Sequence, residues 1–307
     1  MLAVLLLAAG PTAAQEGSHY LPGAFNIQDF AVPPVPGVYA QLFATHYRTS
    51  TFKNRDGDEV TSITVGDQTV PVEVDVKVFA LTPTVYWIAP WKILGADFGV
   101  VASVPLQNTD VGAALPRRGI EVDDATFGIG DLLIQPVLLG WHPGRVDLMA
   151  GYFFYAPTGR YEKGERDNVG LGYWTHSAQG SVVYRGGPNR LWTIAGMATY
   201  DVHTNKEDED LTPGDTFAAE WGVSKILPGP LLEIGVAGYS QWQVSDDSGD
   251  DVTRDPEIHD RVHGIGPQLS WTSQSQRVNV AFRWLWEFGA RDRFEGQLGQ
   301  LTLTLVF

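Results

Sequence analysis

The chain has 307 residues, of which 44% are hydrophobic and 19% charged, a composition that excludes intrinsic disorder and allows one large domain or two ordinary ones. Acidic residues outnumber basic ones by 36 to 21, giving a net charge of −15. This balance argues against nucleic acid as a partner, because phosphate binding needs clustered Lys and Arg. The chain contains no cysteine, so disulfide bonds do not stabilise it.

The first ten residues form an apolar run that is too short to cross a bilayer as a helix, and a small-residue stretch follows from Pro11 to Gln15. This pattern predicts a secretory signal peptide over residues 1–14, cleaved after Ala14. No later window holds about 18 consecutive apolar residues, so we expect no transmembrane helix. An exported chain of this kind is either a soluble periplasmic protein or a β-barrel of the outer membrane.

From about residue 37 onward, apolar and polar residues alternate in segments that end at Gly, Pro, Asn or Asp. In the clearest segment, large apolar side chains occupy every second position from Val278 to Phe288, which is the period of a strand with one apolar face. The last segment has the same pattern and ends on the aromatic residue Phe307. About twelve strands are expected, an even number as in bacterial barrels. They are 37–53, 72–90, 95–110, 126–142, 145–158, 173–187, 190–204, 215–227, 231–245, 259–273, 276–291 and 295–307.

The connections between these segments alternate between short and long. The short ones include Pro143-Gly144 and Ser273–Ser275. The long ones are Asn54–Pro71, Asn108–Asp124, Gly159–Gly172, Asn205–Asp215 and Asp246–Ile258. Greek-key sandwiches mix connection lengths, whereas up-and-down barrels have short periplasmic turns and long extracellular loops. The predicted fold over residues 37–307 is therefore an all-β, antiparallel transmembrane barrel, integral to the outer membrane of a Gram-negative bacterium.

Side chains on the face opposite the lipid are predicted to line the barrel lumen. The pore-lining candidates are Tyr39, Phe43, Tyr86, Asp131, Phe153, Tyr155, Tyr239, Arg283 and Glu287. Aromatic rings offer a stacking surface to a flat apolar solute, while carboxylates and amides keep the route wet. The same rings could instead fill the lumen, because a barrel of about twelve strands has little spare room. Both interpretations stay open.

Residues 15–36 contain four prolines and cannot form a central strand or a long helix. They are predicted to be either a periplasmic N-terminal segment or a small plug that enters the lumen. The plug is favoured, because several large apolar residues need burial: Tyr20, Leu21, Phe25, Ile27 and Phe30.

An enzyme is not expected. No G-x-S-x-G motif occurs, and the seven histidines are scattered, with His19 before the barrel. We predict no catalytic residue and no cofactor. The acidic runs Glu207–Asp210 and Asp246–Asp251 lack EF-hand spacing, so we predict no metal site.

Several different motifs follow one another along the chain in a characteristic order. Gly17–Gly23 is followed by Pro33–Tyr39, then by Phe127–Leu132, and the most specific pair is Ala156–Tyr161 with Asn168–Thr175. Together they resemble the outer-membrane family labelled "putative MetA-pathway of phenol degradation". The resemblance implies a barrel that is associated with the breakdown of aromatic compounds and passes hydrophobic aromatics inward. It supplies no catalytic residue.

The leading hypothesis is a channel or transporter that allows uptake of small hydrophobic or aromatic compounds by passive diffusion. Two alternatives stay open: a porin for polar solutes such as nucleosides or oligosaccharides, and a closed barrel acting as an anchor, an adhesin or an outer-membrane enzyme. The expected partners are the solute, outer-membrane lipid and lipopolysaccharide, and the barrel-assembly machinery during biogenesis, with no nucleic acid.

Overall fold

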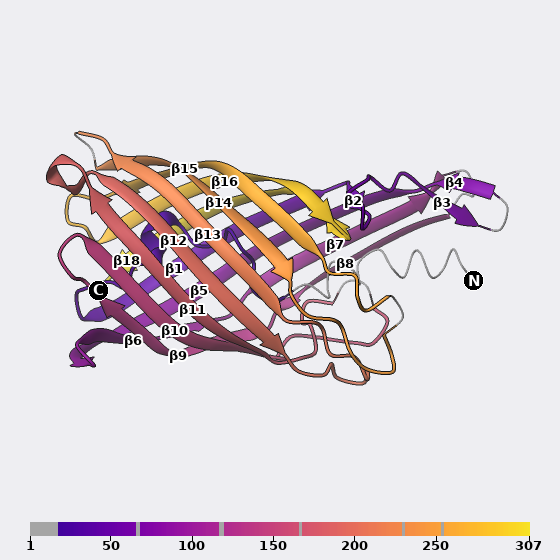
Figure 1. The fold of residues 1–307 in the computed structure, drawn as a ribbon, viewed down its shortest axis with the longest axis horizontal. Coiled ribbons are helices and arrows are strands. Elements are labelled where there is room, and N and C mark those ends of the chain that lie inside the picture. Colours follow the sequence, from indigo (N-terminus) through magenta and orange to yellow (C-terminus); the bar gives the residue numbers. More distant parts are fainter. Residues whose placement is uncertain (1–17, 66–67, 117–119, 166–167, 229–230, 253–254) are drawn as a thin grey trace.

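The computed structural model describes residues 18–307 except 66–67, 117–119, 166–167, 229–230 and 253–254. In this part of the chain, twelve antiparallel strands close into one barrel, as the sequence predicts. Figure 1 shows the tilted strands, with the long loops gathered at one end. None of the described helices is long and apolar enough to cross a membrane. The predicted signal peptide, residues 1–14, lies outside the described residues.

Each strand of the wall pairs antiparallel with its neighbours, and β1 pairs with both β18 and β5, which closes the sheet. In chain order the wall consists of β1 (Gly37–Thr49), β5 (Glu73–Ile93), β6 (Ala96–Ser103) with β7 (Leu106–Leu115), β8 (Ile120–Ile129) with β9 (Leu132–Trp141), β10 (Val146–Ala156), β11 (Thr175–Gly186), β12 (Trp192–His203), β13 (Thr216–Ile226), β14 (Leu232–Gln243), β15 (Arg261–Thr272), β16 (Val278–Arg291) and β18 (Gln297–Val306).

Two of the predicted strands are interrupted where they lie side by side. Val104-Pro105 separates β6 from β7, and Gly130-Asp131 separates β8 from β9. β6 pairs with β9, β7 pairs with β8, and both β6 and β7 pair with β5 along its 21 residues. Proline cannot donate to a strand ladder, so Pro105 ends one pairing, and its carbonyl accepts the Gly130 N–H at 2.8 Å.

Strands also occupy two segments whose sequence predicts long loops. β7 and β8 extend into 108–124, and β3 (Ser62–Val65) and β4 (Gln68–Pro71) form a hairpin within 54–71. Buried Ile63 and Val70 pack against Leu115, which attaches the hairpin to the extension of the wall. Figure 1 shows this extension projecting beyond the other strands at the long-loop end. A second small sheet pairs β2 (Phe52–Lys53) with β17 (Arg293–Phe294).

The two faces of the wall differ in exposure as the alternation predicts. In β16, Phe282 and Trp286 are 45% and 48% exposed on the outer face, whereas Arg283 and Leu285 are 1% and 0% exposed on the inner face. Exposed aromatic residues also lie near strand ends on the outer face: Trp174, Tyr184, Trp192 and Tyr200. Such rings are typical of the boundary between lipid and water.

Residues 18–36, called the N-terminal segment below, lie inside the barrel (Figure 1). The segment enters at the short-turn end, where Gly37 begins β1, and includes the 3-10 turn η1 (Ile27–Phe30), which contacts β11, β12 and β13. Ser18 reaches the long-loop half of the lumen, where it donates a hydrogen bond to Asp201 near the end of β12.

A charge on the outer face of the barrel will destabilise it according to depth. Ile265 lies near the middle of β15 and is 41% exposed, so Ile265→Arg places a cation in the apolar band and is expected to lower the unfolding free energy by about 2–4 kcal/mol. The control Val202→Arg lies next to the end of β12 and should cost about 0–1 kcal/mol. Urea unfolding in liposomes measures both. Equal losses would contradict the placement of Ile265 in the middle of the apolar band and of Val202 at its edge.

Candidate functional site

The N-terminal segment is seated where the inner wall carries glycine. A Cβ atom at Gly222 would lie 2.4 Å from Ile27 Cγ1, and one at Gly140 would lie 2.5 Å from Val32 Cβ. Both distances are far below van der Waals contact, so any larger residue would displace the segment. The absence of side chains at these two positions creates the space that Ile27 and Val32 fill.

Polar side chains of the wall bind the backbone of the N-terminal segment. Glu220 of β13 accepts hydrogen bonds from the Tyr20 hydroxyl and, at 2.9 Å, from the Gly23 N–H. Arg283 of β16 donates to the Gly23 carbonyl at 2.8 Å and to Gln268. Gln268 also accepts the Ile27 N–H at 3.1 Å. These buried groups are therefore paired by the segment, as buried polar groups must be.

Burial holds the Tyr20 phenol in its neutral, donating form. The pKa of Tyr20 is raised well above its ordinary value, first by burial and then by the neighbouring Glu220 carboxylate. A neutral phenol can donate to that carboxylate, whereas a phenolate could not. The phenol therefore remains the donor in this contact.

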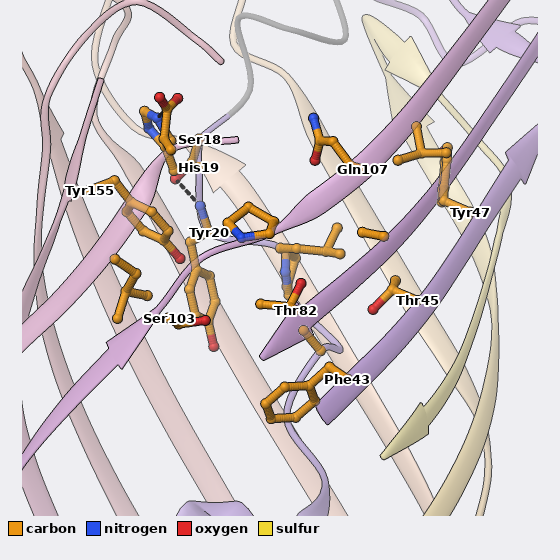
Figure 2. A pocket seen from close by; sticks show the side chains of 18 of the residues that line it. Ser18, His19, Tyr20, Phe43, Thr45, Tyr47, Thr82, Ser103, Gln107 and Tyr155 are labelled. Carbon is orange, nitrogen blue, oxygen red and sulfur yellow. Dashed lines mark hydrogen bonds and ion pairs between the residues drawn. The ribbon is translucent and has the colours of Figure 1, made fainter. Parts of the chain in front are cut away.

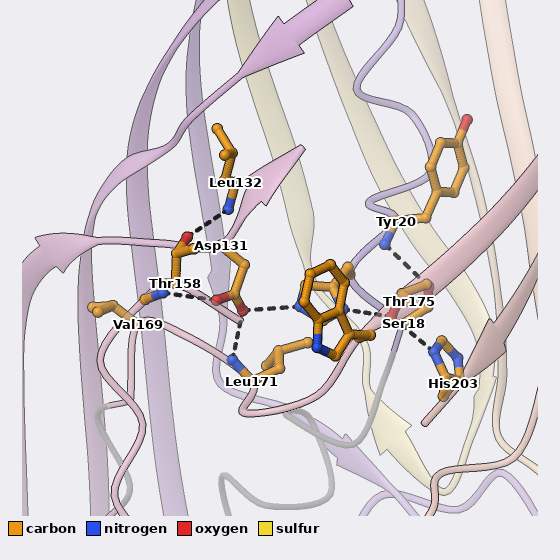
Figure 3. A network of polar contacts seen from close by, with 12 residues as sticks. Ser18, Tyr20, Asp131, Leu132, Thr158, Val169, Leu171, Thr175 and His203 are labelled. Carbon is orange, nitrogen blue, oxygen red and sulfur yellow. Dashed lines mark hydrogen bonds and ion pairs between the residues drawn. The ribbon is translucent and has the colours of Figure 1, made fainter. Parts of the chain in front are cut away.

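The outer end of the N-terminal segment is held by Asp131, the residue at the interruption between β8 and β9. His19 Nε2 lies 2.8 Å from Asp131 Oδ2, and His19 Nδ1 lies 2.6 Å from the Thr175 hydroxyl. The Thr175 hydroxyl is in turn 2.9 Å from Nδ1 of His203. The His19 ring also stacks on Tyr155, with centroids 4.8 Å apart. Figure 3 shows the polar contacts that lead from Asp131 to Thr175 and His203.

The same carboxylate binds both ends of the long loop between β10 and β11. Asp131 accepts the Gly159 N–H and the Leu171 N–H, each at 2.8 Å (Figure 3). Glycine permits a close approach of the backbones here, because a Cβ at Gly159 would lie 2.8 Å from Gly170 Cα and 3.0 Å from Gly130 Cα. Asp131 thus links the wall, the loop and the N-terminal segment at one point.

A cavity of about 420 Å³ lies between the N-terminal segment and the long-loop end of the barrel. Figure 2 shows Tyr20 and Tyr155 on one side of it and Phe43 on another. Small residues of β5, such as Ala80 and Thr82, leave room along the wall. The further lining includes Val76, Val78, Thr84, Val101, Ser103, Gln135, Phe294, Asp260 and Arg293. The cavity is thus bounded by aromatic rings, aliphatic side chains and hydroxyl groups. Its charged lining residues include Asp260, Glu287 and Arg293.

The predicted lumen residues all lie inside the barrel, but they have different surroundings. Those that line the cavity are Phe43, Tyr86, Asp131, Phe153, Tyr155 and Glu287. Outside the cavity lining, Tyr39 donates to the Val35 carbonyl, Arg283 binds the segment, and Tyr239 donates to Glu287 at 2.7 Å. Of the plug candidates, Tyr20 and Phe25 form part of the cavity wall, and Phe30 is buried beneath it. Leu21 also lines the cavity and is 42% exposed.

The sequence did not predict the contact of His19 with Asp131, or that the loop between β10 and β11 binds the same carboxylate. His19 stands before the first strand, and its partner Asp131 is 112 residues away. The signal available was the set of motifs that carry the family resemblance. Four of these motifs contain Ser18-His19, Gly130-Asp131, Gly159 and Gly170-Leu171. These motifs meet at one place in the structure.

A model of the protein family described as "Putative MetA-pathway of phenol degradation" matches residues 60–303. The chain belongs to this family. The search of curated proteins found no match. In this member of the family, the short turns face the periplasm and the long loops face the outside of an outer-membrane barrel.

Solved structures share the fold at low sequence identity. The COG4313 outer membrane channel from Pseudomonas putida F1 is 14% identical, with a TM-score of 0.73 over 94% of this chain and 100% of that one. The transport unit of the autotransporter AIDA-I from Escherichia coli is 10% identical, with a TM-score of 0.56 over 98% of this chain and 99% of that one. At these identities, both comparisons show a shared fold and nothing further.

Neutralising Asp131 should loosen the loop and the N-terminal segment together. In Asp131→Asn the amide oxygen replaces a carboxylate that binds three donors, so amide hydrogen exchange at 19–23 and at 168–172 is expected to rise about tenfold or more. Asp147→Asn is the control, because Asp147 bonds His142 and Arg185 at the periplasmic end. Faster exchange in only one of the two segments would show that they are not coupled.

Proposed function

We propose that the protein is an outer-membrane channel through which small hydrophobic or aromatic molecules diffuse passively. The observation that carries this proposal is the lumen cavity of about 420 Å³. Ligand pockets commonly measure about 300–1,000 Å³, and a cavity of about 150 Å³ can hold benzene. The space above the N-terminal segment therefore suits one substituted ring or a short apolar chain.

The lining of the cavity favours apolar solutes. Phe43, Phe153 and Tyr155 offer ring faces and edges, and Val76, Val78 and Val101 offer aliphatic surface. The charged groups have partners within the protein: Asp131 binds His19, and Glu287 accepts hydrogen bonds from Tyr47 and Tyr239. A flat apolar molecule gains stacking contacts here without stripping water from an unpaired charge.

The N-terminal segment acts in this proposal as a plug that must shift during transport. Its residues Tyr20, Ile27, Phe30 and Val32 are buried in one apolar cluster with inner-wall residues. This cluster occupies the lumen between the cavity and the periplasm. A solute in the cavity therefore reaches the periplasm only if the segment moves aside.

The comparisons support an apolar solute. The family is described by a pathway of phenol degradation, and the neighbour with the TM-score of 0.73 is named as an outer membrane channel. The proposal assigns the chain no enzymatic activity. Its further partners are outer-membrane lipid, lipopolysaccharide and the barrel-assembly machinery that inserts barrels.

Filling the cavity should slow aromatic flux. Ala80→Phe adds a ring to the inner face of β5 without touching the N-terminal segment, and it is expected to reduce the uptake of phenol or toluene into proteoliposomes several-fold. The control Leu81→Phe adds bulk one residue later, on the outer face, where Leu81 is 36% exposed, and should leave flux unchanged. Faster flux of nucleosides than of aromatics in the wild type would instead favour the polar porin.

A further inference from the structure

The acidic protein carries a basic periplasmic end. The cations near its short turns are Lys92, Arg145, Arg185, Arg190, Lys225 and Arg277. The acidic residues described near the same turns point inward: Asp97 and Asp147 have side chains 6% and 14% exposed, and Glu233 bonds Gln28 and Ser224. With a net charge of −15 for the whole chain, the charge is strongly polarised along the barrel.

Three of these cations lie on neighbouring turns and form what we call the periplasmic basic patch: Arg145, Arg190 and Lys225. Arg145 donates to the Gly187 carbonyl of the next turn at 3.0 Å. Arg190 ends the 3-10 turn η3 (Pro188–Arg190), and Lys225 of β13 is in register with Trp192 of β12. The three positions therefore follow one another around the rim.

The patch lies at the level where the membrane meets water. Lys225 Nζ sits 5.0 Å from the ring centroid of Trp192, which is 43% exposed on the outer face. Tyr184, 44% exposed, is paired with Val146 beside Arg145. Outward aromatic rings mark the lipid headgroup region, and a cation stacked on such a ring lies in the same region.

The cations of the patch have no acidic partner within the described residues. Arg145 bonds a carbonyl, Lys225 stacks on an indole, and neither these two nor Arg190 forms an ion pair with a carboxylate there. Arginine presents a planar fork of donors that matches phosphate oxygens, and lysine adds a point charge. Three such groups beside a lipid-facing aromatic row suit a phosphate that is attached to a membrane.

We propose that the periplasmic basic patch binds the phosphate of anionic phospholipids in the inner leaflet of the outer membrane. The turns around the patch are short, so they do not carry the cations beyond the headgroup layer. Lipid bound at this end of the barrel, where the N-terminal segment also enters, helps to fix the depth and tilt of the barrel in the membrane. This binding depends on the barrel fold and not on the identity of the transported solute.

The test compares lipid retention by two charge-matched variants. Arg145→Gln, Arg190→Gln and Lys225→Gln are combined in one protein, and Arg55→Gln, Arg160→Gln and Lys163→Gln, at the extracellular end, in the control. Each is reconstituted with phosphatidylethanolamine alone or with added phosphatidylglycerol, and lipid retained after extraction is counted by native mass spectrometry. Heat-modifiable gel mobility checks that both barrels are folded.

The patch variant should retain phosphatidylglycerol about tenfold more weakly than the wild type, and the control should match the wild type. Added inorganic phosphate should not displace the lipid, because the outward rings of Tyr184 and Trp192 contact the lipid but offer nothing to a free phosphate ion. Equal retention by the patch variant and the wild type would overturn the proposal. Displacement by inorganic phosphate, or equal retention of phosphatidylethanolamine, would also overturn it.

Discussion

The structure depends on one constraint: in a bilayer, every backbone N–H and C=O of a spanning strand must find its partner within the protein. β1 meets this demand by pairing with β18 on one side and with β5 on the other, so the sheet closes without an edge at membrane depth. Closure also separates the outer face of the sheet, which contacts lipid, from the inner face, which does not. Apolar side chains such as Phe282 face lipid, and polar ones such as Arg283 must be satisfied inside. The antiparallel circuit also places successive connections at alternate ends of the barrel, so the short turns gather at one end and the long loops at the other.

Closure at twelve strands leaves a lumen that the side chains of the wall do not fill by themselves. The N-terminal segment resolves this by packing Ile27 against glycines of the wall and by pairing Glu220, Gln268 and Arg283. Its outer end meets Asp131, which also binds the loop between β10 and β11. The remaining space is the cavity, so the same contacts that seat the segment define the shape of the proposed solute site. Lumen filling and solute passage, which the sequence leaves as alternatives, thus concern different halves of one lumen.

The wall was predictable because its signal is local: alternation and turn residues place strands within a few residues, as for β16 and β18. The interruptions at Pro105 and Asp131 were not, because each depends on which neighbour a strand pairs with at that height. Inner-face residues could be assigned by parity, yet parity does not distinguish Phe43, which lines the cavity, from Tyr39, which does not. The contact of His19 with Asp131 joins residues 112 apart and has no local pattern. Both residues belong to motifs that carry the family resemblance, but no pattern in the sequence indicates that the two motifs meet.

The most direct test of the proposed route is to tie the N-terminal segment to the wall. A Cβ at Gly222 would lie 3.5 Å from Ile27 Cβ, which is within the span of a disulfide, and the chain has no other cysteine. In Ile27→Cys with Gly222→Cys, aromatic flux into liposomes should fall to the protein-free level under oxidising conditions and return with reductant, while the single variants respond to neither. Equal flux in the oxidised and reduced states would show that solutes cross without moving the segment, which would contradict the account.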